Sequence, residues 1–304
     1  MKTERILVHI DTGHVSDALI QKILIMAQQK STTIELFSCC YNQSLHRSYI
    51  FDDEAEKHAI AGFLHQEEAK LIQLAEQLES QGCQISYDVT WNRSVAEGII
   101  RKALRYRADV VVFPIGRHSQ GHYLFRQGDW QLIAECPTPL LLMREQEWSA
   151  HPRVAALVDP FHHCDEPQQL DNEVLKGTQA LSEWLVAEQH VVHSFTTIPQ
   201  AAIFDEHLTV DYAAMHEKVK LKHTKVLQAM VGNNAVLHLE QGDVHTVIPE
   251  LATRESIDIL VMGSIARGLL DRFLMGSSVE RIVDHVECDV LLVKQPDFVS
   301  PVTE

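Results

Sequence analysis

Short apolar runs alternate with longer segments of helical periodicity along the whole chain. A short unbroken apolar run is typical of a strand that is covered on both faces in a parallel sheet, and the intervening apolar spacing is typical of amphipathic helices. The first half is therefore predicted as β-α-β-α-β-α-β-α-β. Its strands are expected at 5–10, 32–40, 84–91, 110–113 and 139–143, and its helices at 15–29, 52–80, 95–107 and 129–136.

The second half repeats this order of elements. Its strands are expected at 154–158, 190–196, 235–241, 259–261 and 290–293, and its helices at 168–189, 211–231, 243–255 and from Gly276 onward. Asp11 and Asp159 lie 148 residues apart, and Asp109 and Asp258 lie 149 apart. This nearly constant spacing predicts a tandem duplication of one doubly wound α/β unit, with domains at 1–147 and 151–304.

The last strand of each half, Leu140–Met143 and Val290–Val293, is apolar. Each is expected at the edge of its sheet, and an uncovered apolar edge invites pairing. We therefore expect self-association of the two halves through these strands.

Charge and composition exclude several classes of protein. The 304 residues carry 42 acidic and 26 basic side chains, a net charge of −16, which disfavours a nucleic-acid partner. No apolar run reaches the roughly 18 residues of a membrane span. The N-terminus runs directly into a strand and leaves no room for a signal peptide. With six irregularly spaced cysteines that suit reduced core positions, the expected location is the cytoplasm.

The stretch after the strand at 259–261 carries the strongest candidate chemistry. Gly263 follows this strand, and Gly276, Ser277 and Ser278 stand at the head of the next helix. The free N–H groups and dipole of a helix N-terminus favour an anion, so these residues form a candidate phosphate cradle. A purely structural role of this helix start, without a ligand, stays open, because Ser277 and Glu280 also fit a capping box.

This stretch resembles the nucleotide loop of the universal stress protein family: glycine, two residues, glycine, nine residues, glycine, then serine or threonine. Gly263, the nine residues 267–275, Gly276 and Ser277 fit this pattern, whereas Ala266 replaces its second glycine. The resemblance extends over nearly the whole chain and is closest to the tandem, E-type members of gammaproteobacteria. It rests also on Trp91-Asn-Arg, on Gly128-Asp-Trp through Cys136-Pro-Thr-Pro139, and on Glu240-Gln-Gly-Asp-Val-His.

The resemblance implies a five-stranded parallel sheet of order 3-2-1-4-5 in each half and an adenine nucleotide, ATP or AMP, in the C-terminal half. It implies that Asp159 reaches the ribose and that the backbone of Ser194 meets the adenine. The remaining implied contacts are with Met262 and Gly263 and with the phosphate loop that contains Ala266, Gly276, Ser277 and Ser278.

The two halves differ in this loop. Pro114 stands where the second half has Gly263, Gln127 replaces Gly276, and Asp129 places a carboxylate at the helix head, where it would repel a phosphate. The first half is therefore expected to have lost the phosphate loop. Its histidines and aromatic residues would suit an uncharged or apolar ligand, or equally a core and lid.

Two functions remain open from the sequence. One is a non-enzymatic nucleotide-binding stress protein, and the other is an interaction module whose loop Ala266 has disabled. Slow ATP hydrolysis has little support, since no general base or Mg²⁺-binding carboxylate pair is identifiable. His118 with His122, and His162-His163-Cys164, have residue types that bind zinc. With 18 histidines in the chain such groupings arise by coincidence, and no metal is predicted.

Overall fold

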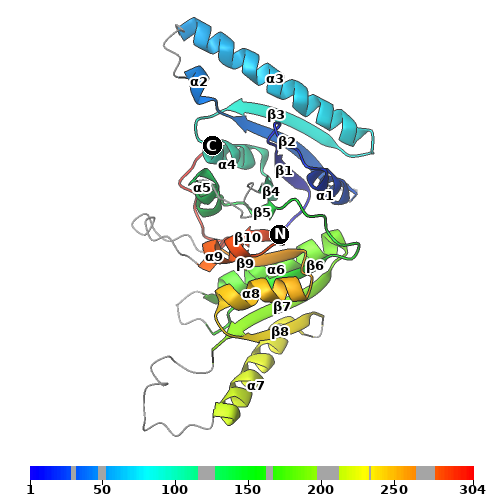
Figure 1. Ribbon diagram of the computed structural model, residues 1–304, viewed down its shortest axis with the longest axis vertical. Helices are drawn as coiled ribbons and strands as arrows, with labels where there is room; N and C mark the ends of the chain where they lie inside the picture. The colour runs from blue at the N-terminus through cyan, green and yellow to red at the C-terminus, as the bar shows by residue number, and fades with distance from the viewer. Residues whose placement is uncertain are drawn as a thin grey trace. The chain divides into compact units, whose positions relative to one another are not determined.

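The computed structural model of the chain describes residues 1–28, 32–46, 53–115, 127–161, 167–196, 212–232, 234–264 and 278–304 (Figure 1). It confirms the α/β class with parallel sheets. By compactness the chain divides into two units. The first comprises Met1–Trp148 with Ser264 and the C-terminal segment Asp297–Glu304, and the second lies between Ser149 and Pro296 without Ser264. The domain bounds 1–147 and 151–304 stay a prediction.

The first unit contains a parallel sheet of order β3-β2-β1-β4-β5. Its strands are β1 (Arg5–His9), β2 (Thr33–Cys40), β3 (Ile85–Trp91), β4 (Val110–Pro114) and β5 (Leu140–Met143). Its helices are α1 (Asp17–Ala27), α2 (Gln43–His46), α3 (Asp53–Glu79), α4 (Val95–Tyr106) and α5 (Gln127–Glu135). The sequence analysis missed α2, because four residues are too few to show a helical period.

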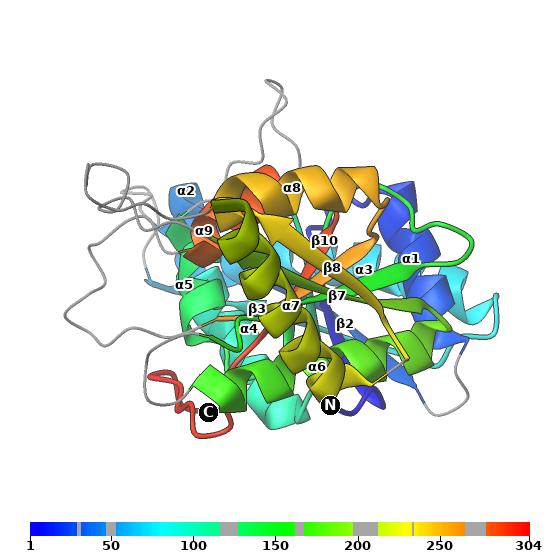
Figure 2. The same cartoon turned by 90° about the horizontal axis from the view of Figure 1, so that it is seen from below.

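The second unit repeats this topology, with the order β8-β7-β6-β9-β10. Its strands are β6 (Arg153–Leu157), β7 (Glu188–Phe195), β8 (Val236–Gln241), β9 (Ile259–Gly263) and β10 (Asp289–Val293). Its helices are α6 (Pro167–Leu185), α7 (Tyr212–Val231), α8 (Val244–Arg254) and α9 (Ser278–His285). Figure 2 shows α8 and α9 on one side of this sheet and α6 on the other, and α7 packs against β8.

The predicted helix 168–189 was too long at its C-terminal end. The helix α6 ends at Leu185, and β7 already begins at Glu188. Val186 has a left-handed backbone with φ of 54°, and the N–H of Ala187 bonds back to the carbonyl of Ser182. This conformation ends a helix in the way a glycine normally does, but a valine gives no sign of it in the sequence.

Two aspartates with the repeat spacing perform the same task in the two units. In the first, Asp109 Oδ2 accepts hydrogen bonds from the backbone N–H groups of Glu4 and Arg5, each at 3.0 Å. In the second, Asp258 accepts from the N–H groups of Ser149 and Arg153 at 2.7 and 2.9 Å. Asp109 thus fixes the start of β1 against β4, and Asp258 fixes the start of β6 against β9. The same contact in both units supports the predicted duplication.

The left-handed residue after α6 provides a test of local strain. Val186 is 79% exposed, so replacing it removes little buried surface. We expect Val186→Gly to stabilise the protein by about 1 kcal/mol, because a left-handed conformation is costly for a β-branched residue and not for glycine. Urea unfolding followed by circular dichroism measures the change. Gly232, with φ of 69° after α7, is the matched control, and Gly232→Val should lower stability. A destabilised Val186→Gly would contradict this view of the helix end.

Candidate functional site

The candidate site lies where β6 ends between β7 and β9. Because these strands are parallel, their carboxyl ends meet at one edge of the sheet, and the chain leaves β6 at the switch point of the doubly wound topology. Asp159 follows β6 at this point, and its side chain is 54% exposed. Its Oδ1 accepts a hydrogen bond from the N–H of Phe161 at 3.3 Å, and its own N–H donates to Asp171 Oδ1 at 3.3 Å. The structure therefore fixes this carboxylate in a turn at the sheet edge.

Ser194 lies near the carboxyl end of β7. Its hydroxyl donates to the carbonyl oxygen of Gly242 at 2.9 Å, and the N–H of Gly242 bonds to the carbonyl of Phe195 at 3.1 Å. Gly242 has φ of 141°, and a side chain there would approach Val247 to 2.8 Å. The Ser194 hydroxyl thus joins β7 to the turn after β8. The contact of the Ser194 backbone with an adenine stays a prediction.

Met262 and Gly263 form the carboxyl end of β9. Met262 is buried at 4% exposure. A Cβ atom on Gly263 would lie 2.5 Å from both Cγ and Cδ2 of Leu170 in α6. The close packing of α6 on β9 therefore accounts for this glycine without any ligand. The contact with Leu170 could not be predicted from the sequence, which offered only the nucleotide loop or an ordinary strand boundary as reasons for Gly263.

Most of the predicted phosphate loop lies outside the described residues, namely Ala266, Gly276 and Ser277. Ser278 is the first residue of α9, two residues after the predicted helix start at Gly276. In the first unit, the corresponding loop connects Pro114, the last residue of β4, to Gln127, the first residue of α5. Asp129 lies in the first turn of α5, as the comparison of the two halves predicted.

A cluster of histidine and phenylalanine rings lies beside Asp159, and the sequence analysis did not identify it. His193 of β7 has its Nδ1 3.0 Å from the carbonyl oxygen of Val158 and its Nε2 2.8 Å from Nδ1 of His223 in α7. Phe161 stacks on the His223 ring, with centroids 3.8 Å apart and planes at 20°. The Oδ1 of Asp159 is 3.8 Å from His193 Nδ1. The cluster therefore connects the candidate carboxylate with the helix that covers this face.

The environment of this cluster favours neutral imidazoles. Burial lowers the pKa of His193, although its hydrogen bond to Val158 and the charge of Asp159 act in the raising direction. Burial lowers the pKa of His223 as well, and so do its neighbours His193 and Lys222. A faint signal was present in the sequence: His193 interrupts the inward-facing apolar residues Val191 and Phe195 of β7. Its pairing with a residue 30 positions away depends on tertiary packing.

The corresponding edge of the first unit has a different chemistry. His9, the last residue of β1, is 8% exposed and stacks on Phe113 with centroids 5.3 Å apart. Burial lowers its pKa to about 4, against the raising influence of Asp11 and a backbone hydrogen bond to Cys39. On this edge Thr12 also hydrogen-bonds the buried carboxylate of Glu67. This edge is thus rich in acidic groups and carries a neutral imidazole, which makes it a poor site for a phosphate.

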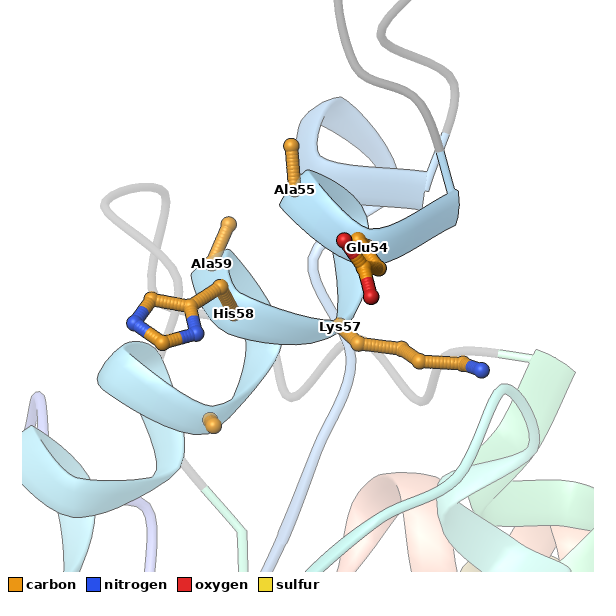
Figure 3. Close-up of a pocket in the computed structure, with 6 residues that line it drawn as sticks. Glu54, Ala55, Lys57, His58 and Ala59 are labelled. Carbon is orange, nitrogen blue, oxygen red and sulfur yellow. The ribbon is translucent and has the colours of Figure 1, made fainter.

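A surface hollow over α3 does not form a convincing site. It is lined by Glu54, Ala55, Lys57, His58, Ala59 and Ala61. All of them come from one helix, and Figure 3 shows that the side chains of Lys57 and His58 point in different directions. A ligand would find no converging polar groups there.

Among the described residues, no group of three or more histidine, cysteine, aspartate or glutamate side chains is placed to hold a metal ion. The candidate zinc ligands His118, His122 and His162-His163-Cys164 fall outside them. No helix of the described segments is long and apolar enough to cross a membrane.

Comparison with known proteins identifies the family. The sequence pattern of the universal stress protein family matches residues 2–144 and 165–294, which correspond to the two units. The chain belongs to the universal stress protein family. It is 23% identical to universal stress protein E of Photorhabdus laumondii, with 98% of this chain and 97% of that protein aligned. It is 24% identical to universal stress protein E of Escherichia coli K12, with 98% and 96% aligned. The predicted tandem, E-type resemblance is confirmed.

Two solved structures share the fold over nearly the whole chain. A protein of unknown function from Pseudomonas aeruginosa aligns with a TM-score of 0.72 at 20% identity, over 97% of this chain and 94% of that one. A universal stress protein from Archaeoglobus fulgidus aligns with a TM-score of 0.68 at 15% identity, over 97% and 100%. These two likenesses confirm the predicted α/β fold class.

The packing of Gly263 can be separated from any role in ligand binding. We expect Gly263→Ala to destabilise the protein by roughly 1–3 kcal/mol, because its Cβ overpacks the contact between β9 and Leu170. Denaturant unfolding measures the loss. Leu170→Ala has its own cost, but in that background Gly263→Ala should cost little further stability. If Gly263→Ala costs as much stability in the Leu170→Ala background as in the wild type, the glycine is needed for a reason other than its contact with Leu170.

Proposed function

We propose that this universal stress protein binds one adenine nucleotide, ATP or AMP, at the carboxyl edge of its second unit. The observation that carries the proposal is the half-exposed carboxylate of Asp159 at the switch point beside β6. Open α/β sheets bind ligands in the crevice at this point, and an acidic side chain there is a suitable acceptor for ribose hydroxyls. Asp159 is thus our candidate for the ribose contact.

The other contacts follow from the order of elements around this edge. The backbone of Ser194 is our candidate for the adenine contact, with Met262 and Gly263 on the opposite side of β6. Gly276, Ser277 and Ser278 are the candidates for the phosphates, since α9 begins at Ser278 and the N-terminus of a helix favours an anion. Ala266 belongs to the same loop. Phe161 and Phe195 stand close to His223 at this edge, and flat aromatic rings are partners on which bases stack.

The packing of Gly263 favours a second candidate function. Since Leu170 accounts for Gly263, and alanine replaces the second glycine of the family pattern, two of the loop positions no longer require a nucleotide. The alternative is an interaction module that binds partner proteins without a nucleotide. The first unit leaves a further option, an uncharged ligand beside the neutral imidazole of His9.

Two wider expectations accompany this proposal. We propose that β5 and β10, the last strands of the two units, mediate self-association as apolar edge strands. We also propose a cytoplasmic location. Among the described cysteines, Cys39, Cys40, Cys83, Cys136 and Cys288 are not joined in disulfide bonds, in keeping with a reducing compartment.

Titration calorimetry with ATP tests the proposed site, and the duplication supplies a matched control. Asp159→Asn should weaken binding about tenfold, because the amide loses the charge-assisted hydrogen bonds of a carboxylate. Asp11, at the equivalent position of the first unit, should tolerate Asp11→Asn without loss of affinity. Equal weakening by both substitutions would move the nucleotide away from the second unit. No heat of binding with the wild type would favour the interaction module.

A further inference from the structure

The hydrogen bonds of His193 and His223 fix the positions of their protons. A carbonyl oxygen only accepts hydrogen bonds, so the contact of His193 Nδ1 with Val158 places a proton on Nδ1. In a neutral His193 the Nε2 atom is then an acceptor. The nitrogen 2.8 Å away, Nδ1 of His223, must therefore carry the proton of that hydrogen bond. The Nε2 of a neutral His223 is left as the basic atom of the pair.

This arrangement admits one additional proton. A proton on Nε2 of His223 leaves both hydrogen bonds intact, because Nδ1 of His223 still donates to His193. A second proton, on Nε2 of His193, would set two N–H groups against each other across 2.8 Å. His193 is almost fully buried, at 1% exposure, so it has no room to turn away. The two imidazoles therefore behave as one titrating unit.

Charged groups on each neighbouring element act on this unit. Asp159, after β6, favours the cationic form of both rings. Lys222, the residue before His223 in α7, opposes it, and its Nζ lies 5.3 Å from the centre of the Phe161 ring. Asp171 of α6 accepts from the backbone N–H of Asp159, and His216 of α7 packs on Phe195 with centroids 5.8 Å apart. The balance keeps the pair neutral near pH 7, since the pKa values of both histidines are lowered.

We propose that His193 and His223 form a one-proton relay that makes an anionic ligand at the carboxyl edge of the second unit bind more tightly as the pH falls. This inference rests on the proposed nucleotide site, because it needs an anion at that edge. The physical reason is linkage: a bound anion stabilises the cationic pair, so binding takes up a proton, and proton uptake must strengthen binding as pH decreases. The relay would give this stress protein a response to acidification of its surroundings.

The second unit contains a comparison pair with the same spacing. His190 Nδ1 and His238 Nε2 also lie 2.8 Å apart, on strands β7 and β8. Because side chains alternate along β7, His190 and His193 point to opposite faces of the sheet, and Arg254 and Glu255 at the end of α8 act on His238. This pair lies away from Asp159, so His238 is a suitable control.

The titration of the pair itself is measured by NMR of the imidazole nitrogens, in the full chain without ligand. We expect a single protonation shared by His193 and His223 with a midpoint below about 6.5, and Nδ1 of His193 protonated throughout. Two separate protonations, one on each ring, would overturn the relay. This experiment does not depend on whether any nucleotide binds.

The coupling is measured by ATP titration calorimetry at about pH 7.5 and about pH 5.5. His223→Gln keeps a side chain that can donate to His193 but cannot take up a proton. Relative to this variant, the wild type should gain roughly three- to tenfold more affinity at the lower pH, a comparison that cancels the titration of the nucleotide phosphates. His238→Gln should keep the wild-type pH dependence.

Equal pH dependence in the wild type and in His223→Gln would overturn the coupling. Loss of the pH dependence in His238→Gln would overturn it as well, because the response would then belong to the other pair. A wild type that fails to bind ATP at both pH values contradicts the proposed function, and the coupling fails with it. The single shared protonation is decided separately by the NMR titration.

Discussion

The central strand of each unit is hydrogen-bonded along both edges, and most of its side chains are buried. The strand β1 pairs with β2 and β4, and β6 pairs with β7 and β9. Polar backbone groups at the ends of such a strand need partners, because leaving them buried and unpaired costs free energy. At the amino ends, Asp109 and Asp258 supply these partners. At the carboxyl end of the second unit, His193 donates to Val158. His193 of the candidate site thus also meets a structural requirement of the sheet, because it is the hydrogen-bond partner of the Val158 carbonyl.

The two units carry different side chains at the carboxyl edges of their sheets. Arg5 pairs with Thr33 in the first unit, and Arg153 pairs with Glu188 in the second. When the units are aligned on these two pairs, Ser38 of β2 corresponds to His193 of β7, because each lies five residues further along its strand. A small hydroxyl in one unit stands where the other carries the buried imidazole that contacts α7. Conversely, the first unit buries His9 at the end of β1, where burial brings its pKa to about 4. One fold therefore presents two edges with different charge and hydrogen-bonding capacity.

The sequence predicted the architecture well because each strand and helix has a strong local signature. Unbroken apolar runs such as that of β9 predict buried parallel strands, and the repeat spacing predicts the duplication. The errors lie where local conformation has no local signature, as at the left-handed Val186. The candidate site could be predicted only in part. Asp159 follows from its place after β6, whereas the packing of Leu170 on Gly263 and the pairing of His193 with His223 depend on tertiary contacts.

The proposed function requires the duplicated fold to bind a nucleotide in one copy only. Native mass spectrometry of the intact chain with increasing ATP counts the bound molecules directly. We expect the mass of one nucleotide per chain to be added and then no second one, because Asp129 places a carboxylate in the first turn of α5, where it would repel a phosphate. Two bound nucleotides of similar affinity per chain, or none at any concentration, would contradict this claim.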